Sequence, residues 1–459
     1  MPNVDLQHLQ NMRSHFETGI TQTHSFRKKQ LLLLKQAVIK YEKEISAALY
    51  ADLKKSAEEA YSTEIGLVLS ELNLAIKNLH SWMATKFVNT DLANLPSSSK
   101  IYRDPLGVVL IISPWNYPFQ LMMNPLIGAI AGGNVAVVKP SEFAESTAAI
   151  IEKIITEIFP SEYVHVVQGD GATVVPAMMQ SFRFDHVFYT GSIPVGRAIY
   201  KMAAENLTPV TLELGGKSPC VVEADANLSI AAKRIILGKF INVGQTCIAP
   251  DYVLVHQSIK DELILKMKSS IEKFYTVDAS TSYDYGKIIN EKRFDKLVSY
   301  LAEGKILYGG VHDKRILFFE PTLMEDVSLS SSLMKEEIFG PILPIISYNS
   351  TEEALEIIKQ NENPLAFYLF TTNKKTEEQF IKSVPFGGGC INNADWHFTN
   401  HNLPFGGVGN SGMGAYHGKF TFDTFTRLKA VLKTPNWWDP FIKYPSFKGR
   451  LRLFKWIFR

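Results

Sequence analysis

Four continuous apolar runs, each followed directly by a polar motif, constrain the fold of this chain more than any other feature. They cover residues 107–112, 134–138, 164–167 and 186–189, and helix-like segments separate them. An apolar run without alternation is typical of a strand buried on both faces of a parallel sheet. Strands that alternate with helices predict a doubly wound, Rossmann-like α/β sheet, which binds ligands beside the carboxyl ends of its strands. The polar motifs at these ends are therefore candidate binding residues.

Length and composition limit the class of protein. A chain of 459 residues predicts two or three domains, and strand-like runs at 220–222, 252–255 and 342–346 indicate a second α/β domain. The net charge of +2 gives no electrostatic reason to expect nucleic acid. Three separated cysteines without a C-x-x-C pair argue against a disulfide framework and a zinc site, so we expect no metal. The polar N-terminus has no signal-peptide pattern, and we expect a cytoplasmic protein.

Helical periodicity dominates the first part of the chain. Between residues 25 and 82, apolar positions recur at helical spacing among lysines and glutamates, with one face within 34–45 and another within 65–76. We interpret this part as long surface helices that pack on a larger body. Residues 85–100 are polar and predict a loop with short strands.

Two motifs carry residues suited to covalent catalysis. Cys247 follows Gly-Gln-Thr and precedes a proline, in a sequence that suits neither a helix interior nor a plain core strand. Glu213 ends an apolar run and meets two glycines. A thiol and a carboxylate on two such turns would act as nucleophile and general base at one site. A free cysteine is more often a buried structural residue, which is our interpretation of Cys220 and Cys390.

Both motifs resemble the cysteine and glutamate signatures of the aldehyde dehydrogenase superfamily, and the chain is most similar to its class 3, fatty-aldehyde-type branch. The likeness covers nearly the whole chain and is strongest between residues 102 and 427. It implies oxidation of an aldehyde to the carboxylic acid with NAD or NADP, through a Cys247 thiohemiacetal and a thioester that is hydrolysed with Glu213 as base. Asn116 and the backbone N–H of Cys247 would stabilise the oxyanion. Without the resemblance, an asparagine between prolines is equally typical of a turn.

The resemblance also implies a cofactor site at the strand ends. Its residues are Trp115, Lys139, Glu142, Gly191, Ser192, Gly196, Leu214, Glu337 and Phe339. Lys139 and Glu142 would contact the adenosine ribose, although alone they would be an exposed ion pair. A carboxylate at Glu142 would repel a 2′-phosphate and so favours NAD, whereas class 3 relatives also accept NADP. The turn at residues 191–196 would lie under the pyrophosphate at a helix N-terminus, but its Gly-x-x-x-x-Gly spacing is a weak signal alone.

Domain boundaries follow from the same resemblance. It implies an NAD(P)-binding domain at 1–82 and 105–212, a catalytic domain at 213–419, and a β oligomerisation arm at 83–104 and 420–434, of which 421–433 is β-like. The N-terminus lacks the extension of tetrameric relatives, so we expect a homodimer. Aromatic residues predict an apolar tunnel for a medium- or long-chain aliphatic or an aromatic aldehyde; they are Trp115, Tyr117, Trp396, Phe398 and Phe405.

The C-terminal tail, residues 435–459, interleaves aromatic and basic residues, as interfacial helices do. It is too short and too charged to span a bilayer. We therefore expect it to contact a membrane peripherally or to gate a lipidic substrate. The alternative is a helix that docks on the protein's own surface or on a partner subunit.

Three other functions fit parts of the pattern. The same fold can acylate CoA, but that chemistry does not need the base that Glu213 would supply. A glutamyl-phosphate-type reductase is a second alternative, and the surrounding motifs do not resemble it. The third is a catalytically silent structural or membrane-bound protein, which the presence of Cys247, Glu213 and Asn116 disfavours.

Overall fold

The sheet that contains the four apolar runs, called the first sheet below, is doubly wound, as predicted. The computed structural model describes residues 5–458, and the four apolar runs form parallel neighbours in a six-stranded sheet of order β17-β7-β6-β3-β4-β5. Its strands are β3 (Val108–Ile112), β4 (Val135–Lys139), β5 (Val164–Val166), β6 (His186–Gly191), β7 (Val210–Leu214) and the antiparallel β17 (Gly412–Met413). Every residue of β3 and β4 is buried, which explains why these strands are apolar without alternation. The connecting helices are α6 (Gln120–Gly132), α7 (Glu145–Ile158), α8 (Gly171–Ser181) and α9 (Ile193–Glu205).

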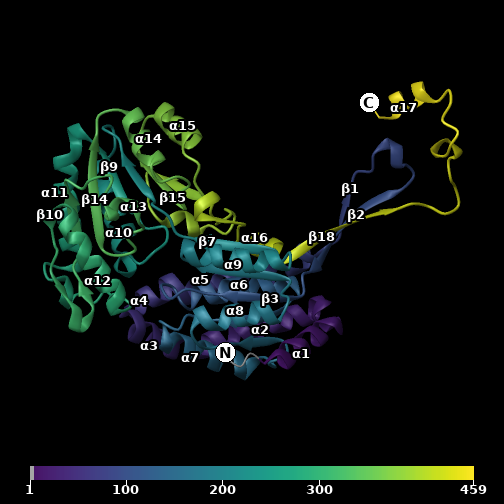
Figure 1. The fold of residues 1–459 in the computed structure, drawn as a ribbon, viewed down its shortest axis with the longest axis horizontal. Helices are drawn as coiled ribbons and strands as arrows, with labels where there is room; N and C mark the ends of the chain where they lie inside the picture. Colours follow the sequence, from purple (N-terminus) through teal and green to yellow (C-terminus); the bar gives the residue numbers. More distant parts are fainter. Residues whose placement is uncertain (1–4, 459) are drawn as a thin grey trace.

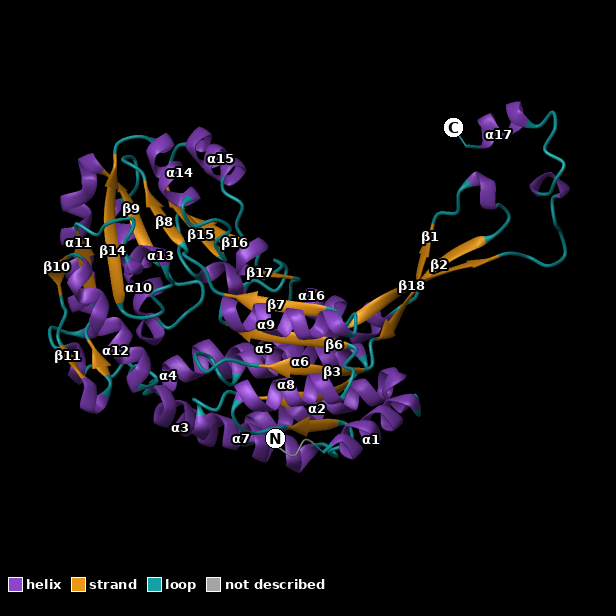
Figure 2. Cartoon of the chain, in the orientation of Figure 1, coloured by secondary structure: helices purple, strands orange, loops and turns teal. Residues whose placement is uncertain are grey.

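The N-terminal helices cover one face of this sheet, as Figure 2 shows. They are α1 (Leu6–Glu17), α2 (His24–Lys40), α3 (Glu42–Leu53) and α5 (Gly66–Met83). Both predicted apolar faces point inward, since Leu34, Ile45, Val68 and Leu72 are fully buried. The predicted long helices are present, but the sequence did not predict the break between α3 and α5. There the chain turns at a left-handed Lys54, forms the short α4 (Ala57–Ala60), and continues as a π-helix, η2 (Tyr61–Ile65).

A second sheet carries the rest of the α/β pattern. Its order is β10-β13-β14-β9-β8-β15-β16, parallel except for β10, and the predicted strands at 220–222, 252–255 and 342–346 are all present. The strands are β8 (Pro219–Val222), β9 (Tyr252–His256), β10 (Lys305–Tyr308), β13 (Thr322–Glu325), β14 (Ile342–Tyr348), β15 (Ala366–Phe370) and β16 (Gly388–Ile391), with β11 (His312–Asp313) and β12 (Phe318–Phe319) as a separate hairpin. The helices are α10 (Leu228–Phe240), α11 (Lys260–Tyr275), α12 (Glu291–Tyr300), α13 (Ser332–Lys335), α14 (Thr351–Lys359) and α15 (Lys374–Ser383).

A three-stranded antiparallel sheet projects from the body (Figure 1) and forms the arm. It contains β1 (Lys86–Val88), β2 (Ser98–Pro105) and β18 (Thr426–Lys433), with β18 paired to β2 along its whole length. The prediction that 421–433 is β-like is wrong at its start, because α16 (Lys419–Thr424) precedes β18. The tail continues through a short turn of helix, η11 (Phe441–Lys443), to α17 (Leu451–Ile457) at the far end of the arm. Within residues 5–458, no helix is long and apolar enough to cross a membrane.

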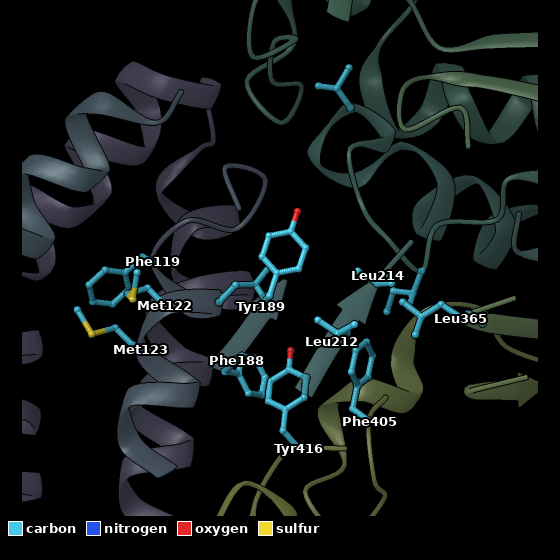
Figure 3. Packing of buried hydrophobic residues seen from close by; sticks show 14 of the residues in the cluster. Phe119, Met122, Met123, Phe188, Tyr189, Leu212, Leu214, Leu365, Phe405 and Tyr416 are labelled. Carbon is cyan, nitrogen blue, oxygen red and sulfur yellow. The ribbon is translucent and has the colours of Figure 1, made fainter. Parts of the chain in front are cut away.

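Aromatic packing ties the glycine-rich segment near residues 405–416 to the first sheet (Figure 3). The ring of Tyr416 lies 5.3 Å from that of Phe188 on β6 and 5.5 Å from that of Phe405. The segment continues into β17, in which Gly412 pairs with Glu213 of β7. The chain therefore returns to the first sheet beside the predicted general base. The domain boundaries that the resemblance implies stay a prediction.

Candidate active site

Cys247 lies in an irregular loop that follows α10. The loop begins with the short helix η4 (Ile241–Gly244), in which Asn242 and Val243 both have positive φ angles of 50° and 57°. Such left-handed conformations cost energy in residues with side chains and persist only where contacts fix them. The thiol is partly buried and borders a pocket. The other lining residues are Thr63, Tyr117, Gln120, Leu121, Ile241, Thr246, Ile248, Asp395, Phe398, Tyr416 and His417.

The surroundings of the thiol keep it protonated at rest. Burial is the main cause that raises the pKa of Cys247, and the carboxyls of Glu337, Glu213 and Asp395 raise it further. A neutral thiol is a weak nucleophile, because the thiolate is the attacking form. The site therefore needs a group that takes the thiol proton or a positive charge that stabilises the thiolate.

Asn116 lies beside the Cys247 loop, as predicted for an oxyanion donor. It follows β3 and is 2 % exposed. Its side-chain Nδ2 donates to the carbonyl of Gln245 at 3.0 Å, two residues before Cys247. One N–H of the amide is fixed in this bond, and the other remains to donate to a substrate oxygen. The next residue adds a second link, because the Tyr117 hydroxyl is 2.7 Å from Thr246 Oγ1.

Glu213 lies on β7 and is buried without a partner. Because side chains alternate along a strand, it points away from the face that carries Leu212 and Leu214, both labelled in Figure 3. It is 3 % exposed, and neither carboxyl oxygen has a hydrogen-bond partner among the described residues. Burial raises the pKa of Glu213 well above its ordinary value. A carboxylate in this position readily takes a proton, as a general base must.

Lys139 and Glu142 form an ion pair at the end of β4. Glu142 also accepts from the backbone N–H of Gly171, at the start of α8, at 3.0 Å. Burial alone favours the neutral acid, but the bonds from Lys139 and Gly171 outweigh it and hold the pKa of Glu142 below its ordinary value. The strand end therefore presents an ammonium and a carboxylate together, a donor and an acceptor for the two hydroxyls of a ribose.

At the carboxyl end of β6, helix α9 packs closely on the neighbouring strand β7. Ser192 precedes α9 and makes no side-chain cap bond among the described residues, so amides of the first turn stay available to an anion. A Cβ added at Gly196 would lie 2.5 Å from Leu214 Cδ2, so the glycine lets α9 pack closely on β7. Gly191 is the last residue of β6. These residues fit the pyrophosphate part of a dinucleotide.

Glu337, Phe339 and Trp115 lie together on the other side of the site. The rings of Trp115 and Phe339 meet edge to face with centroids 5.2 Å apart. A Cβ at Gly215 would be 2.0 Å from Glu337 Oε2, so the glycine makes room for this carboxyl next to β7. Burial, and then Asp251, raises the pKa of Glu337 to about 8. The structure thus brings three of the predicted cofactor residues together, and the set as a whole fits a dinucleotide.

The predicted aromatic tunnel is only partly correct. Tyr117 and Phe398 line the pocket, but Trp115 packs on Phe339 instead. Trp396 is 54 % exposed, and Phe405 stacks on His417 at 4.9 Å between ring centroids. The sequence shows where the aromatic residues stand along the chain, but it does not show in which direction their side chains point.

Sequence reasoning missed two sets of charged residues at this site. Asp395 lines the pocket with Cys247, has a φ of 69°, and burial raises its pKa to about 7. The irregular segment around it was the only signal. Lys55 and Glu64, both buried, lie behind the Asn116 loop, and their helical spacing had indicated a solvated surface. Within residues 5–458, no group of three or more metal-ligating side chains is placed to hold a metal ion.

The model of the aldehyde dehydrogenase family matches residues 7–431. The 4,4'-diaponeurosporen-aldehyde dehydrogenase of Staphylococcus aureus is 45 % identical over the full length of both chains. Aldehyde dehydrogenase family 3 member H1 of Arabidopsis thaliana is 45 % identical, covering 97 % of this chain and 93 % of that one. The dimeric NADP-preferring aldehyde dehydrogenase of Canis lupus familiaris is 43 % identical, covering 96 % and 98 %.

The solved structures agree. A substrate-bound structure of Staphylococcus aureus AldH superposes on the whole chain with a TM-score of 0.98 at 45 % identity, and all of that chain is covered. Its fold is therefore that of the present structure throughout, arm and tail included. The chain belongs to the aldehyde dehydrogenase family, in its class 3 branch, and is an NAD(P)-dependent oxidoreductase that converts an aldehyde to the carboxylic acid.

Proposed function

We propose that Cys247 is the nucleophile, that Asn116 and the Cys247 backbone N–H hold the oxyanion, and that Glu213 is the general base. The observation that carries this assignment is the 3.0 Å bond from Asn116 Nδ2 to the Gln245 carbonyl, which joins the donor to the nucleophile's own loop. The unpartnered, buried Glu213 supports the third role. Donors fixed before reaction stabilise developing charge without reorganisation.

The chemistry proceeds in two halves. Cys247 first gives its thiol proton to Glu213, which passes it to solvent. The thiolate sulfur then attacks the aldehyde carbon, a C–S bond forms, and the carbonyl oxygen becomes an oxyanion beside Asn116. When bound, NAD(P) supplies the acceptor for the hydride that leaves as the C=O bond forms again. Glu213 then takes a proton from water, the hydroxide adds to the thioester, and the C–S bond breaks to give the acid and the thiolate.

We propose that Glu142 accepts from the hydroxyls of the adenosine ribose and that the enzyme uses NAD better than NADP. The low pKa of Glu142 keeps it charged at neutral pH, and a charged carboxylate repels a 2′-phosphate. Lys139 favours such a phosphate, which accounts for some use of NADP. The name of the canine relative, which prefers NADP, shows that this branch accommodates both.

The substrate proposal is a medium- or long-chain aliphatic or an aromatic aldehyde. Apolar and aromatic side chains, including Leu121, Ile248 and Phe398, supply much of the lining of the pocket beside Cys247. The Staphylococcus aureus relative acts, by its name, on an apolar diaponeurosporene aldehyde, which supports an extended apolar chain.

The arm supports a homodimer. β18 is an edge strand, with no strand on its other side among residues 5–458, and its Leu428, Val431 and Leu432 are exposed. An unpaired edge with apolar side chains is a ready surface for a second copy. The canine relative, dimeric by its name, matches this chain over 98 % of its own length, which supports the same assembly here.

We propose that the enzyme is cytoplasmic and that its C-terminal tail contacts a membrane peripherally. Its Trp437, Phe441, Trp456 and Phe458 are all more than two-thirds exposed, and five basic residues lie among them between residues 443 and 455. Exposed rings with basic residues bind the interface of an anionic bilayer. Part of the tail instead packs on the arm, where Phe447 and Phe454 share a groove with Leu92 and Leu95.

The activity test measures NADH and NADPH formation from straight-chain aldehydes of increasing length and from benzaldehyde. We expect a Cys247→Ala variant to be inactive, and Cys390→Ala, a half-buried thiol outside the site, to be active. A Cys247→Ala variant with wild-type turnover would contradict the assignment. Activity that appears only after CoA is added would instead favour the acylating reaction.

The membrane test is flotation with phosphatidylglycerol liposomes, comparing the full chain with a truncation after Asp439. Flotation of the full chain alone supports the proposal. Equal behaviour of the two chains contradicts it and favours docking of the tail on the arm or on the partner subunit.

A further inference from the structure

The oxyanion donor and the nucleophile belong to different sheets, and a short charged segment lies between them. Asn116 follows β3 of the first sheet, whereas Cys247 lies in the loop after α10, which belongs to the second. The segment that joins α3 to α5, residues 54–65, contains the π-helix η2. Such π-helical turns are rare and often lie at functional sites.

Lys55 places a buried ammonium against the Asn116 turn. The side chains of Lys55 and Glu64 are both 0 % exposed, and Lys55 Nζ lies 2.5 Å from Glu64 Oε1. The same Nζ donates to the backbone carbonyl of Asn116 at 3.1 Å. It also lies 4.0 Å from the ring centroid of Tyr117, the neighbour that borders the substrate pocket.

Glu64 holds the other end of the same turn. Its Oε2 accepts from the backbone N–H of Phe119 at 2.9 Å and of Gln120 at 3.1 Å, at the start of α6. A carboxylate at a helix N-terminus satisfies amides that have no partner within the helix. The Lys55–Glu64 pair therefore fixes the backbone on both sides of the turn that carries Asn116.

The Cys247 loop reaches the same carbonyl from the opposite side. Asn242 Nδ2 donates to the Asn116 carbonyl at 2.8 Å and to the Gln245 carbonyl at 3.2 Å. Glu59, from the same segment as Lys55, accepts from the backbone N–H of Asn242 at 3.0 Å. The left-handed Asn242 is thus held by a contact from this segment, and the Asn116 carbonyl receives one donor from this segment and one from the Cys247 loop.

A fully buried ion pair is a poor source of stability, because removing both charges from water costs about as much as their attraction returns. Its value lies in geometry, which it fixes through bonds to specific backbone atoms. We propose that Lys55 and Glu64 are positioning residues for Asn116, so that they determine how well the oxyanion is stabilised. This inference rests on the proposed role of Asn116 and deepens it.

The test is a double-mutant cycle between Lys55→Met and Asn116→Ala, in the full-length enzyme with a saturating aldehyde and NAD. Loss of an oxyanion donor costs on the order of a hundredfold in kcat. We expect Lys55→Met alone to lower kcat by about tenfold or more, because small displacements of such donors are costly. In the Asn116→Ala background we expect less than about a twofold further loss, because the side-chain donor that Lys55 positions is already gone. The KM for NAD should change by less than about twofold in each variant.

Arg27→Met is the matched control. Arg27 is also a buried cation, 2 % exposed, and donates to backbone carbonyls of Thr21 at 2.9 Å and of Ala131 near the other end of α6 at 3.0 Å. We expect this variant to lower Tm and leave kcat within about twofold, which separates positioning from general stability.

Glu64→Gln provides a second variant if Lys55→Met does not fold. It keeps an acceptor for the Phe119 and Gln120 amides but removes the charge, and we expect a kcat loss that also disappears in the Asn116→Ala background. Losses that multiply in the double variants, or an unchanged kcat in the single ones, would overturn the inference. If Asn116→Ala itself leaves kcat unchanged, the proposed role of Asn116 fails instead.

Discussion

Glu213 combines a cost to stability with the proposed role of general base. Its folded pKa is raised, so the folded state holds the proton more tightly than the unfolded chain, whose pKa is near 4.5. Its contribution to stability is therefore full below about pH 4.5 and is lost as pH rises through the folded pKa. We expect Glu213→Gln to raise Tm relative to wild type, increasingly so from pH 5 to 8, while thioester hydrolysis slows by about a hundredfold or more. Scanning calorimetry across this pH range, with steady-state kinetics, checks both; a lower Tm at pH 8 would contradict burial as the cause.

We propose that Glu142 determines the choice between the two dinucleotides. Glu142→Gln keeps acceptors for Gly171 but removes the charge that repels a 2′-phosphate. We expect kcat/KM for NADP to rise by about tenfold relative to that for NAD, because a repulsion of about 1.4 kcal/mol between the carboxylate and the 2′-phosphate is lost. Initial rates with each cofactor at subsaturating concentration measure the ratio. An unchanged ratio would show that another residue distinguishes the 2′-hydroxyl of NAD from the 2′-phosphate of NADP.

At the scale of single residues, the sequence predicted site residues that stand in unusual sequence motifs. It missed those that stand in an ordinary helical pattern. Cys247 stands in a motif that suits neither a helix nor a strand, and Glu213 is a single acid near the end of an apolar strand, β7. Lys55 and Glu64 lie in a segment with helical spacing, where a charge is normally solvated. Only the three-dimensional turn at Lys54 buries them, and no local pattern encodes that.

Among the elements, β17 connects the glycine-rich segment to the proposed general base. Gly412 pairs with Glu213 and has a φ of 141°, and a Cβ there would lie 2.0 Å from the Leu212 carbonyl oxygen. We expect Gly412→Ala to lower the free energy of unfolding by at least about 2 kcal/mol and to lower kcat, because β7 must shift at Glu213. Denaturant unfolding and steady-state kinetics measure the two effects.

The control for this prediction is Gly19→Ala. Gly19 also has a positive φ, 75°, but an added Cβ would meet only the end of Gln22 at 3.8 Å. The Gly19→Ala variant should lower the free energy of unfolding by about 1 kcal/mol, which is the cost of the left-handed conformation alone, and should leave kcat unchanged. Equal effects of the two variants would show that the β7–β17 contact has no special role.

Elements were predictable where burial is uniform. β3, for example, is apolar throughout because both its faces are covered, and this pattern is visible without tertiary information. The π-helix η2 and the short α16 were not predicted, because both depend on packing against distant segments. Edge strand β17 has only two residues, too few to leave a period in the sequence.

For the whole molecule, the arm is the proposed means of assembly. Leu432 lies on the exposed side of β18, 48 % exposed, so a charge there does not enter the protein's own core. We expect Leu432→Asp to shift the enzyme from dimer to monomer in light scattering after size-exclusion chromatography, with its circular dichroism unchanged. A variant that stays dimeric, or a wild type that is already monomeric, would contradict assembly through this edge.

The central claim is that the reaction passes through an acyl group on Cys247 that Glu213 releases. The most direct measurement is peptide mass spectrometry of Glu213→Gln after reaction with NAD and a medium-chain aldehyde such as octanal, quenched in acid. The account predicts an added octanoyl mass on the peptide that contains Cys247, and none in a Cys247→Ala, Glu213→Gln double variant. An acyl group on Cys390 or Cys220, or wild-type turnover without any acylated enzyme, would contradict it.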